Sequence, residues 1–187
     1  KGADGMPDIN TEVIDEGTSS FFRMIWNLNE LPTDEALCNW IDDPGVSDLN
    51  GNKWSSSNKM VAGMYARLTF NVTLCNHFLE ETEGITDAET VRQRAEVKFI
   101  RALNYFYLMD FYGNPPFAEK VSAENPVQKS RAEVFEFIEQ ELLSIENEMF
   151  GVQEAPYYRA DKAAAWLMLS RLYLNAEVYT GSARWTD

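Results

Sequence analysis

The sequence predicts an all-α protein, and three observations support this fold class. Apolar residues recur at three- and four-residue spacing in several long segments, as they do on one face of a helix. Two of these segments, residues 95–116 and 161–179, are rich in aromatic residues and alanine. Residues 86–89 (TDAE) and 130–133 (SRAE) have the form of capping boxes, which open helices. No segment alternates apolar and polar residues convincingly, as a half-buried strand does.

The first third of the chain is expected to combine short helices with loops. Residues 1–20 are polar and are expected to be irregular. Residues 21–31 (FFRMIWNLNEL) predict a short helix, and residues 33–40, which open with a threonine and two acids, predict a second one. Residues 42–58 are rich in Asp, Asn, Ser and Gly, so we expect an irregular loop there. A structureless loop of this length in a compact domain is often functional.

Two long helices are expected next. The first covers residues 57–83, and its buried stripe is predicted at Met60, Met64, Leu68, Val72, Cys75 and Leu79. The second opens at the capping box of Thr86 and Glu89 and continues to Tyr112, because Gly113 and two prolines follow. Its inward face is predicted at Val91, Ala95, Phe99, Ala102, Phe106 and Met109.

Two further helices complete the predicted fold. One opens at the capping box of Ser130 and Glu133, and the last covers residues 160–179. Helix pairs that recur about every 34–45 residues, with small alanines opposite large aromatic residues, are typical of tetratricopeptide-like repeats. A small residue on one helix admits a ring from its neighbour, so successive pairs stack closely.

Length and charge limit the classes of function. The 187 residues are enough for one domain, residues 1–187, and the net charge of −14 argues against binding nucleic acid or an anionic membrane surface. Neutral ligands such as sugars remain compatible with this charge. No run is long and apolar enough to span a bilayer, and the first residues do not resemble a signal peptide. Cys38 and Cys75 form either a disulfide or two buried thiols, and we expect thiols.

Residues 94–117 (RAEVKFIRALNYFYLMDFYGNPPF) resemble the signature of the SusD/RagB family, the starch- and glycan-binding outer-membrane lipoproteins of Bacteroidetes. That signature is a helix of the form A-E-x-x-F-x-R-A-x-x-Y-F-x-L, followed by Y-G and a proline-rich turn. Residues 130–135, 162–174 and 31–35 resemble further segments of the family in the right order. The likeness extends over residues 21–185, and it is closer to the SusD type than to the RagB type.

The resemblance implies a truncated N-terminal part of a SusD-like protein, with tetratricopeptide-like helices. Such a protein is not an enzyme: it captures oligosaccharides at the outer face of the outer membrane and delivers them to a SusC-like TonB-dependent transporter. Its attachment to the membrane would use a lipid anchor that is absent from this fragment. The alternative is a RagB-like helical scaffold that binds a protein or peptide.

Sugars offer flat C–H faces flanked by hydroxyls, so they are bound by exposed aromatic rings together with amides or acids. Trp54 in the 42–58 loop, with Asn58, Asn50 and Asn52 around it, supplies this combination, and Trp54 and Asn58 are therefore predicted glycan contacts. The alternative is that Trp54 packs into the helices while the asparagines form turns. Trp40 is a weaker candidate for a glycan contact, since its position favours the core.

No cofactor, catalytic residue or metal site is expected. Asp48, Asn50 and Asn52 have the initial spacing of an EF-hand loop, but Lys53 and Lys59 occupy the positions that require Gly and Glu. The single histidine, His77, has no second histidine or Glu-x-x-His partner for a metal. Glycoside hydrolysis needs two facing carboxylates, and 30 acidic residues produce coincidental pairs, so their number is no evidence for it.

Overall fold

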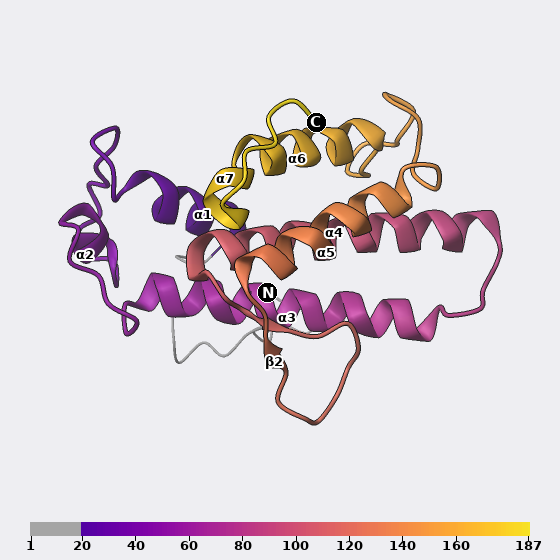
Figure 1. Ribbon diagram of the computed structural model, residues 1–187. Helices are drawn as coiled ribbons and strands as arrows, with labels where there is room; N and C mark the ends of the chain where they lie inside the picture. Colours follow the sequence, from indigo (N-terminus) through magenta and orange to yellow (C-terminus); the bar gives the residue numbers. More distant parts are fainter. Residues whose placement is uncertain (1–19) are drawn as a thin grey trace. The chain divides into compact units, whose positions relative to one another are not determined.

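The structure, a computed structural model, describes residues 20–187, so the expectation for residues 1–19 lies outside the described part. The elements in chain order are α1 (Phe21–Glu30), α2 (Val46–Asn50), α3 (Lys59–Glu81), α4 (Ala88–Tyr112), β1 (Pro116–Phe117), β2 (Val127–Gln128), α5 (Arg131–Ile145), α6 (Lys162–Leu174) and α7 (Ala176–Thr180) (Figure 1). The only sheet in the described residues is the two-residue antiparallel pair β1–β2. The predicted all-α class is therefore confirmed.

The chain consists of two compact units. One unit ends at Phe70 and the other runs from Asn71 to Asp187, so helix α3 contributes residues to both. Cys38 belongs to the first unit and Cys75 to the second, and both are free cysteines. Cys75 is buried, and burial raises the pKa of its thiol to about 11. Cys38 is only half-buried.

In the first unit, α1, α2 and the start of α3 share a small apolar core, whose fully or almost fully buried members are Met24, Leu31, Val46, Leu49, Met60, Met64 and Leu68. The three residues from α3 are those that the periodicity of residues 57–83 predicted. The amide of Asn27, buried on α1, lies 3.2 Å from the sulfur of Met60. This contact ties α1 to α3 inside the unit.

Two expectations for the first unit are wrong. Residues 33–40 form turns instead of a helix, because the Thr33 hydroxyl donates back to the Glu30 carbonyl (2.7 Å) and accepts from the Glu35 amide (3.2 Å). Residues 42–58 are not wholly irregular, because α2 forms within them. The pair Val46 and Leu49, one turn apart, is buried to 0% and 1% exposure and stabilises this short helix.

In the second unit, α4 is the central helix, and the C-terminal half of this helix is buried on most sides. Figure 1 shows α5 running beside α4, and both α6 and α7 also contact α5. Ala102, Ala165 and Ala176 are all buried, and the packing of these small residues against rings stays a prediction. The rings of Phe106 and Tyr179, on α4 and α7, meet edge to face with centroids 6.2 Å apart.

The ends of the long helices follow the sequence closely, with one correction. Ser130 and Glu133 form the predicted capping box at the start of α5, and Gly113 ends α4 with a positive φ of 80°. At the start of α4, however, the capping residue is Asp87 and not Thr86. The Asp87 carboxylate accepts from the Thr90 amide at 3.0 Å, because a short acidic side chain one position later meets the same unpaired amides.

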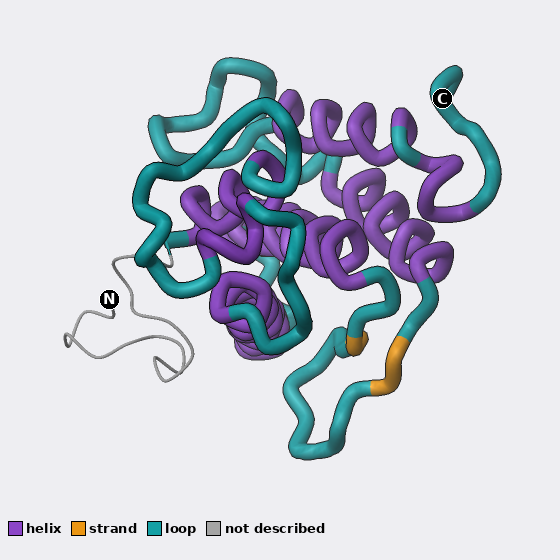
Figure 2. Tube along the Cα trace, turned by 90° about the vertical axis from the view of Figure 1, so that its left-hand side faces the viewer, coloured by secondary structure: helices purple, strands orange, loops and turns teal. Residues whose placement is uncertain are grey.

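The last predicted helix is broken in two at Asn175. The Asn175 side chain donates to the Arg171 carbonyl (2.9 Å), and such local bonds compete with helical hydrogen bonds. Between α4 and α5, strands β1 and β2 lie at the base of a loop that projects from the helices (Figure 2). The β1 residue Phe117 is buried, and its ring packs 4.9 Å from that of Tyr105 on α4.

A buried ion pair joins α4 to α5. The Arg101 guanidinium donates two hydrogen bonds to the Glu141 carboxylate, at 2.7 and 2.9 Å, and a third to the Asn76 side chain at 2.8 Å. The side chains of Arg101 and Glu141 are only 8% and 7% exposed. The Arg-Ala-x-x-Tyr pattern of the α4 sequence thus contributes internal polar contacts.

Candidate functional site

Two exposed tryptophans of the first unit lie in the connection between α1 and α3. Trp40 is 63% exposed and Trp54 is 44% exposed, and the two residues lie on either side of α2 in the chain. The expectation that Trp40 lies in the core is wrong, because residues 33–40 do not form the helix that would have packed it. Both tryptophans therefore offer ring surface to solvent.

Helix α2 fixes the turn that contains Trp40. The Asn50 side chain at the end of α2 accepts from the Cys38 amide (3.4 Å) and donates to the Cys38 carbonyl (3.2 Å). These two hydrogen bonds resemble those between paired strands, and they fix the backbone at Cys38, two residues before Trp40. The Trp40 carbonyl in turn accepts from the Asp43 amide at 3.1 Å, which closes a tight turn.

Arg23 of α1 completes a cluster around Trp40 that the sequence did not predict. The Arg23 guanidinium lies over the Trp40 ring, 4.9 Å from its centroid, and pairs with the Asp43 carboxylate. A stacked arginine beside a carboxylate and an indole presents hydrogen-bond donors, acceptors and a flat apolar face within one small area. The only hint in the sequence is that an arginine interrupts the apolar segment FFRMIWNL of α1.

Trp54 lies between two turns that restrict its backbone. Before it, the Lys53 amide donates to the Asp48 carbonyl at 2.8 Å, and Asn52 takes a positive φ of 52°. After it, the Asn58 amide donates to the Ser55 carbonyl at 3.0 Å. Because the chain is fixed on both sides, the backbone around Trp54 loses little further entropy on binding.

Both the oxygen and the nitrogen of the Asn58 side-chain amide form hydrogen bonds within the protein. Its oxygen accepts from the amides of Met60 (3.0 Å) and Val61 (3.3 Å), which caps α3, and its nitrogen donates to the Gly45 carbonyl (3.1 Å) and the Asp48 carboxylate (3.2 Å). The residue is 4% exposed. The geometry therefore gives Asn58 the role of fixing the loop, as Asn50 does, while Trp54 and Trp40 face solvent.

We expect the substitution Asn58→Ala to lower the free energy of unfolding by about 1–3 kcal/mol, since it removes a helix cap and the side-chain donor to the Gly45 carbonyl and the Asp48 carboxylate. Urea denaturation measures this, with Ser56→Ala, an exposed residue of the same loop, as the matched control. Unchanged stability together with weaker sugar binding would contradict this role and place the Asn58 amide against a ligand.

Among residues 20–187, no group of three or more His, Cys, Asp or Glu side chains could hold a metal ion. Asp48 and Asn50, the start of the apparent calcium pattern, are engaged with Asn58 and Cys38. His77 is exposed on α3. In the described part of the chain, no helix combines the length and the apolar character that a membrane crossing requires. The chemistry of the site is therefore that of aromatic rings, amides and one stacked ion pair.

Comparison with known proteins identifies relatives that match almost the whole chain. The starch-binding protein SusD of Bacteroides thetaiotaomicron is 49% identical over 181 residues, which are 97% of this chain and 32% of that protein. The chain therefore spans about a third of the length of this relative.

Solved structures with the same fold are more distant in sequence. A SusD-like carbohydrate-binding protein of Bacteroides fragilis superposes with a TM-score of 0.64 at 23% identity, over 67% of this chain and 26% of that one. A structure determined with xylogluco-oligosaccharide superposes with a TM-score of 0.69 at 21% identity, over 81% and 30% of the two chains. At this identity they establish the fold alone.

A SusD-like family model, described as starch-binding and associating with the outer membrane, matches residues 9–174. This match includes the α4 signature, the capped start of α5 and the whole of α6. Taken with the identity to SusD and the shared helical fold, it shows that the chain belongs to the SusD-like (SusD/RagB) family.

Proposed function

We propose that this chain is the part of a non-catalytic glycan-capture protein in which Trp40 and Trp54 contact a neutral oligosaccharide. Both rings are exposed in the connection between α1 and α3, and the side chains of Asn50 and Asn58 fix the backbone of this connection. This observation supports the proposal most directly. The 49% identity to a starch-binding protein points to the same class of ligand. The net charge of −14 also favours a neutral ligand over an anionic one.

In this proposal each residue of the site has a separate task. The Trp54 and Trp40 rings stack on the apolar faces of sugar units, and the Arg23–Asp43 pair beside Trp40 hydrogen-bonds to sugar hydroxyls. Asn58 and Asn50 position the loop without contacting the ligand. No step of bond cleavage is involved, so the sugar leaves the site unchanged.

We further propose that the intact protein is held at the outer face of the outer membrane by a lipid anchor. It would hand its glycan to a SusC-like TonB-dependent transporter. The description of the family model as associating with the outer membrane supports this location. Purification of the tagged protein from native membranes tests the partnership, because a stable complex retains the transporter. Recovery of the protein without any transporter would contradict the handover.

Affinity electrophoresis in gels that contain starch, followed by calorimetry with maltoheptaose, tests sugar binding. We expect Trp54→Ala and Trp40→Ala each to weaken binding by about tenfold, because each removes one stacking surface, and the double variant to weaken it by about a hundredfold. Tyr157→Ala is the control, since Tyr157 is 85% exposed and lies in the other unit.

Three results would contradict the proposal in different ways. Wild-type affinity in the double variant would place the site elsewhere. Release of reducing sugar from starch would show an enzyme. Absence of any sugar response, combined with capture of a peptide by the same surface, would favour the RagB-like scaffold.

A further inference from the structure

A groove of about 400 Å³ lies on the second unit, between α5, α6 and the last residues of the chain. Its volume falls within the range of small-molecule sites. The lining combines rings and polar groups, and it includes Leu143, Glu146, Trp166, Ser170, Tyr173 and Trp185. None of these residues belongs to the Trp40 and Trp54 site.

Trp166 is a fixed aromatic surface on one wall of the groove. It is 46% exposed, and its indole nitrogen donates to the Glu146 carboxylate at 3.1 Å. This bond sets the orientation of the ring and leaves the remaining acceptor positions of Glu146 available, because a carboxylate offers about four. A ring of fixed orientation beside a carboxylate is the combination that the first unit presents at Trp40.

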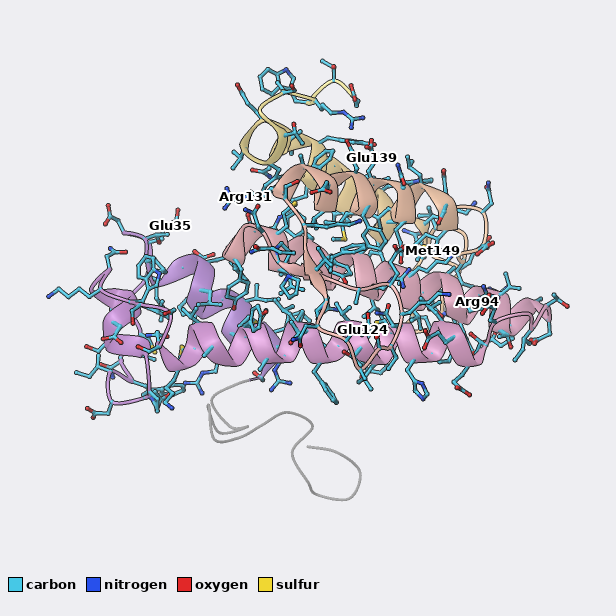
Figure 3. All side chains as sticks on the ribbon, turned by 60° about the horizontal axis from the view of Figure 1, so that its bottom comes forward. Glu35, Arg94, Glu124, Arg131, Glu139 and Met149 are labelled. Atoms are coloured by element: carbon cyan, nitrogen blue, oxygen red, sulfur yellow. The ribbon has the colours of Figure 1, made fainter. Side chains whose placement is uncertain are left out.

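A group of ion pairs holds the last residues of the chain at the groove. Arg184 donates to the two Glu139 oxygens at 2.7 and 2.9 Å and to Asp187 at 2.7 Å, and its guanidinium lies 4.8 Å from the centre of the Tyr173 ring. Glu139, labelled on α5 in Figure 3, also accepts from the Tyr173 hydroxyl at 2.7 Å. The hydrogen bonds from Arg184 lower the pKa of Glu139, so these ion pairs stay charged at neutral pH. Trp185, which follows Arg184 directly and is 63% exposed, is thereby placed at the groove.

We propose that this groove is a second binding site for a neutral oligosaccharide, an inference that rests on the proposed glycan-capture function. The two indole rings supply stacking surfaces, and Glu146 and Ser170 supply hydrogen-bonding groups for sugar hydroxyls. The acidic groups at the groove and the net charge of −14 disfavour an anionic ligand. Two sites on one protein would raise the affinity for a polysaccharide above that for a short oligosaccharide.

The test uses the intact protein and maltoheptaose in a Trp40→Ala/Trp54→Ala background, where the first site is disabled. We expect residual binding in this background, a further loss of about tenfold on adding Trp166→Ala, and no further loss on adding Leu167→Ala. Leu167 is the matched control, because it neighbours Trp166 on α6, is 73% exposed and does not line the groove.

Two results would overturn the second site while leaving the proposed function in place. One is complete loss of binding in the background while the wild type binds, and the other is residual binding that Trp166→Ala does not change. A wild type that does not bind any sugar would instead remove the proposed function, and the second site with it.

Quenching by acrylamide provides an independent measurement in a variant of the intact protein that keeps Trp166 and has Phe at every other tryptophan, including the other four in these 187 residues. We expect maltoheptaose to protect Trp166 from the quencher. If Trp166 is already shielded in the intact protein without sugar, then polypeptide fills the groove and the inference is overturned.

Discussion

Replacing Arg101 by methionine is expected to lower the free energy of unfolding by about 3–5 kcal/mol. The substitution leaves the Glu141 carboxylate, 7% exposed, without the guanidinium that bonds both of its oxygens. The side-chain oxygen of Asn76 on α3 also loses its Arg101 donor. Each of these polar groups is then buried without its strongest hydrogen bond.

The electrostatics of Glu141 explain why removing Arg101 costs much stability although the intact ion pair contributes little net stability. Burial raises the pKa of Glu141, and the hydrogen bonds and charge of Arg101 only partly oppose this rise. Desolvation therefore outweighs the attraction, as it commonly does for ion pairs inside proteins. Removing one partner therefore destabilises the protein strongly, whereas the intact pair contributes little net stability.

Urea denaturation monitored by circular dichroism measures the effect. The double variant Arg101→Met/Glu141→Leu is expected to recover most of the lost stability, because no unpaired charge remains. Arg92→Met is the control on the same helix: Arg92 and its partner Glu89 are 34% and 50% exposed, so the loss there is about 0–1 kcal/mol. If Arg101→Met and Arg92→Met cost the same, the buried pair is not formed as described.

Tyr105→Ala is expected to destabilise the protein by about 3–5 kcal/mol, and Tyr105→Phe by about 1–3 kcal/mol. The Tyr105 ring is 1% exposed and packs against the rings of Phe117 and Phe137. Its hydroxyl donates to the Ala118 carbonyl (2.8 Å) and accepts from the Ala118 amide (2.9 Å). Alanine creates a cavity and removes both bonds, whereas phenylalanine removes only the bonds.

The burial that protects these bonds also raises the pKa of Tyr105 to about 12, so the hydroxyl remains protonated over the whole neutral range. Denaturation midpoints of the two variants separate the cost of the cavity from that of the hydroxyl. Tyr157→Phe, at an 85% exposed tyrosine, is the control and is expected to leave stability unchanged. Equal losses for Tyr105→Phe and Tyr105→Ala would show that the ring itself contributes nothing to packing.

These two residues show what the family signature in α4 encodes. Arg101 and Tyr105 both belong to the sequence that carries the resemblance, and both act inside the fold: one joins α4 to α5, and the other holds the chain after β1. The signature therefore identifies the scaffold. The proposed sugar contacts at Trp40 and Trp54 lie in the other unit.

The candidate site could be predicted only in part. The composition of residues 42–58 drew attention to the segment around Trp54, and the structure leaves the Trp54 ring 44% exposed, while its contact with a glycan stays a prediction. The sequence did not indicate that Arg23 lies over Trp40, because the two residues are brought together by the fold of the connection after α1. Nor did it indicate that the amide of Asn58 is fully used, since three of its four partners are backbone groups.

The all-α class and the extents of α3, α4 and α5 could be established from the amino-acid sequence, because periodicity, capping residues and helix-ending glycines act over only a few neighbouring residues. The family followed separately, from the resemblance of residues 94–117 to its signature. Long-range packing was needed to show that Trp40 faces solvent, that Asn58 is buried, and that Arg101 meets Glu141 forty positions later. The burial of a polar or aromatic side chain depends on groups far away in the chain, and local patterns contain no information about those groups.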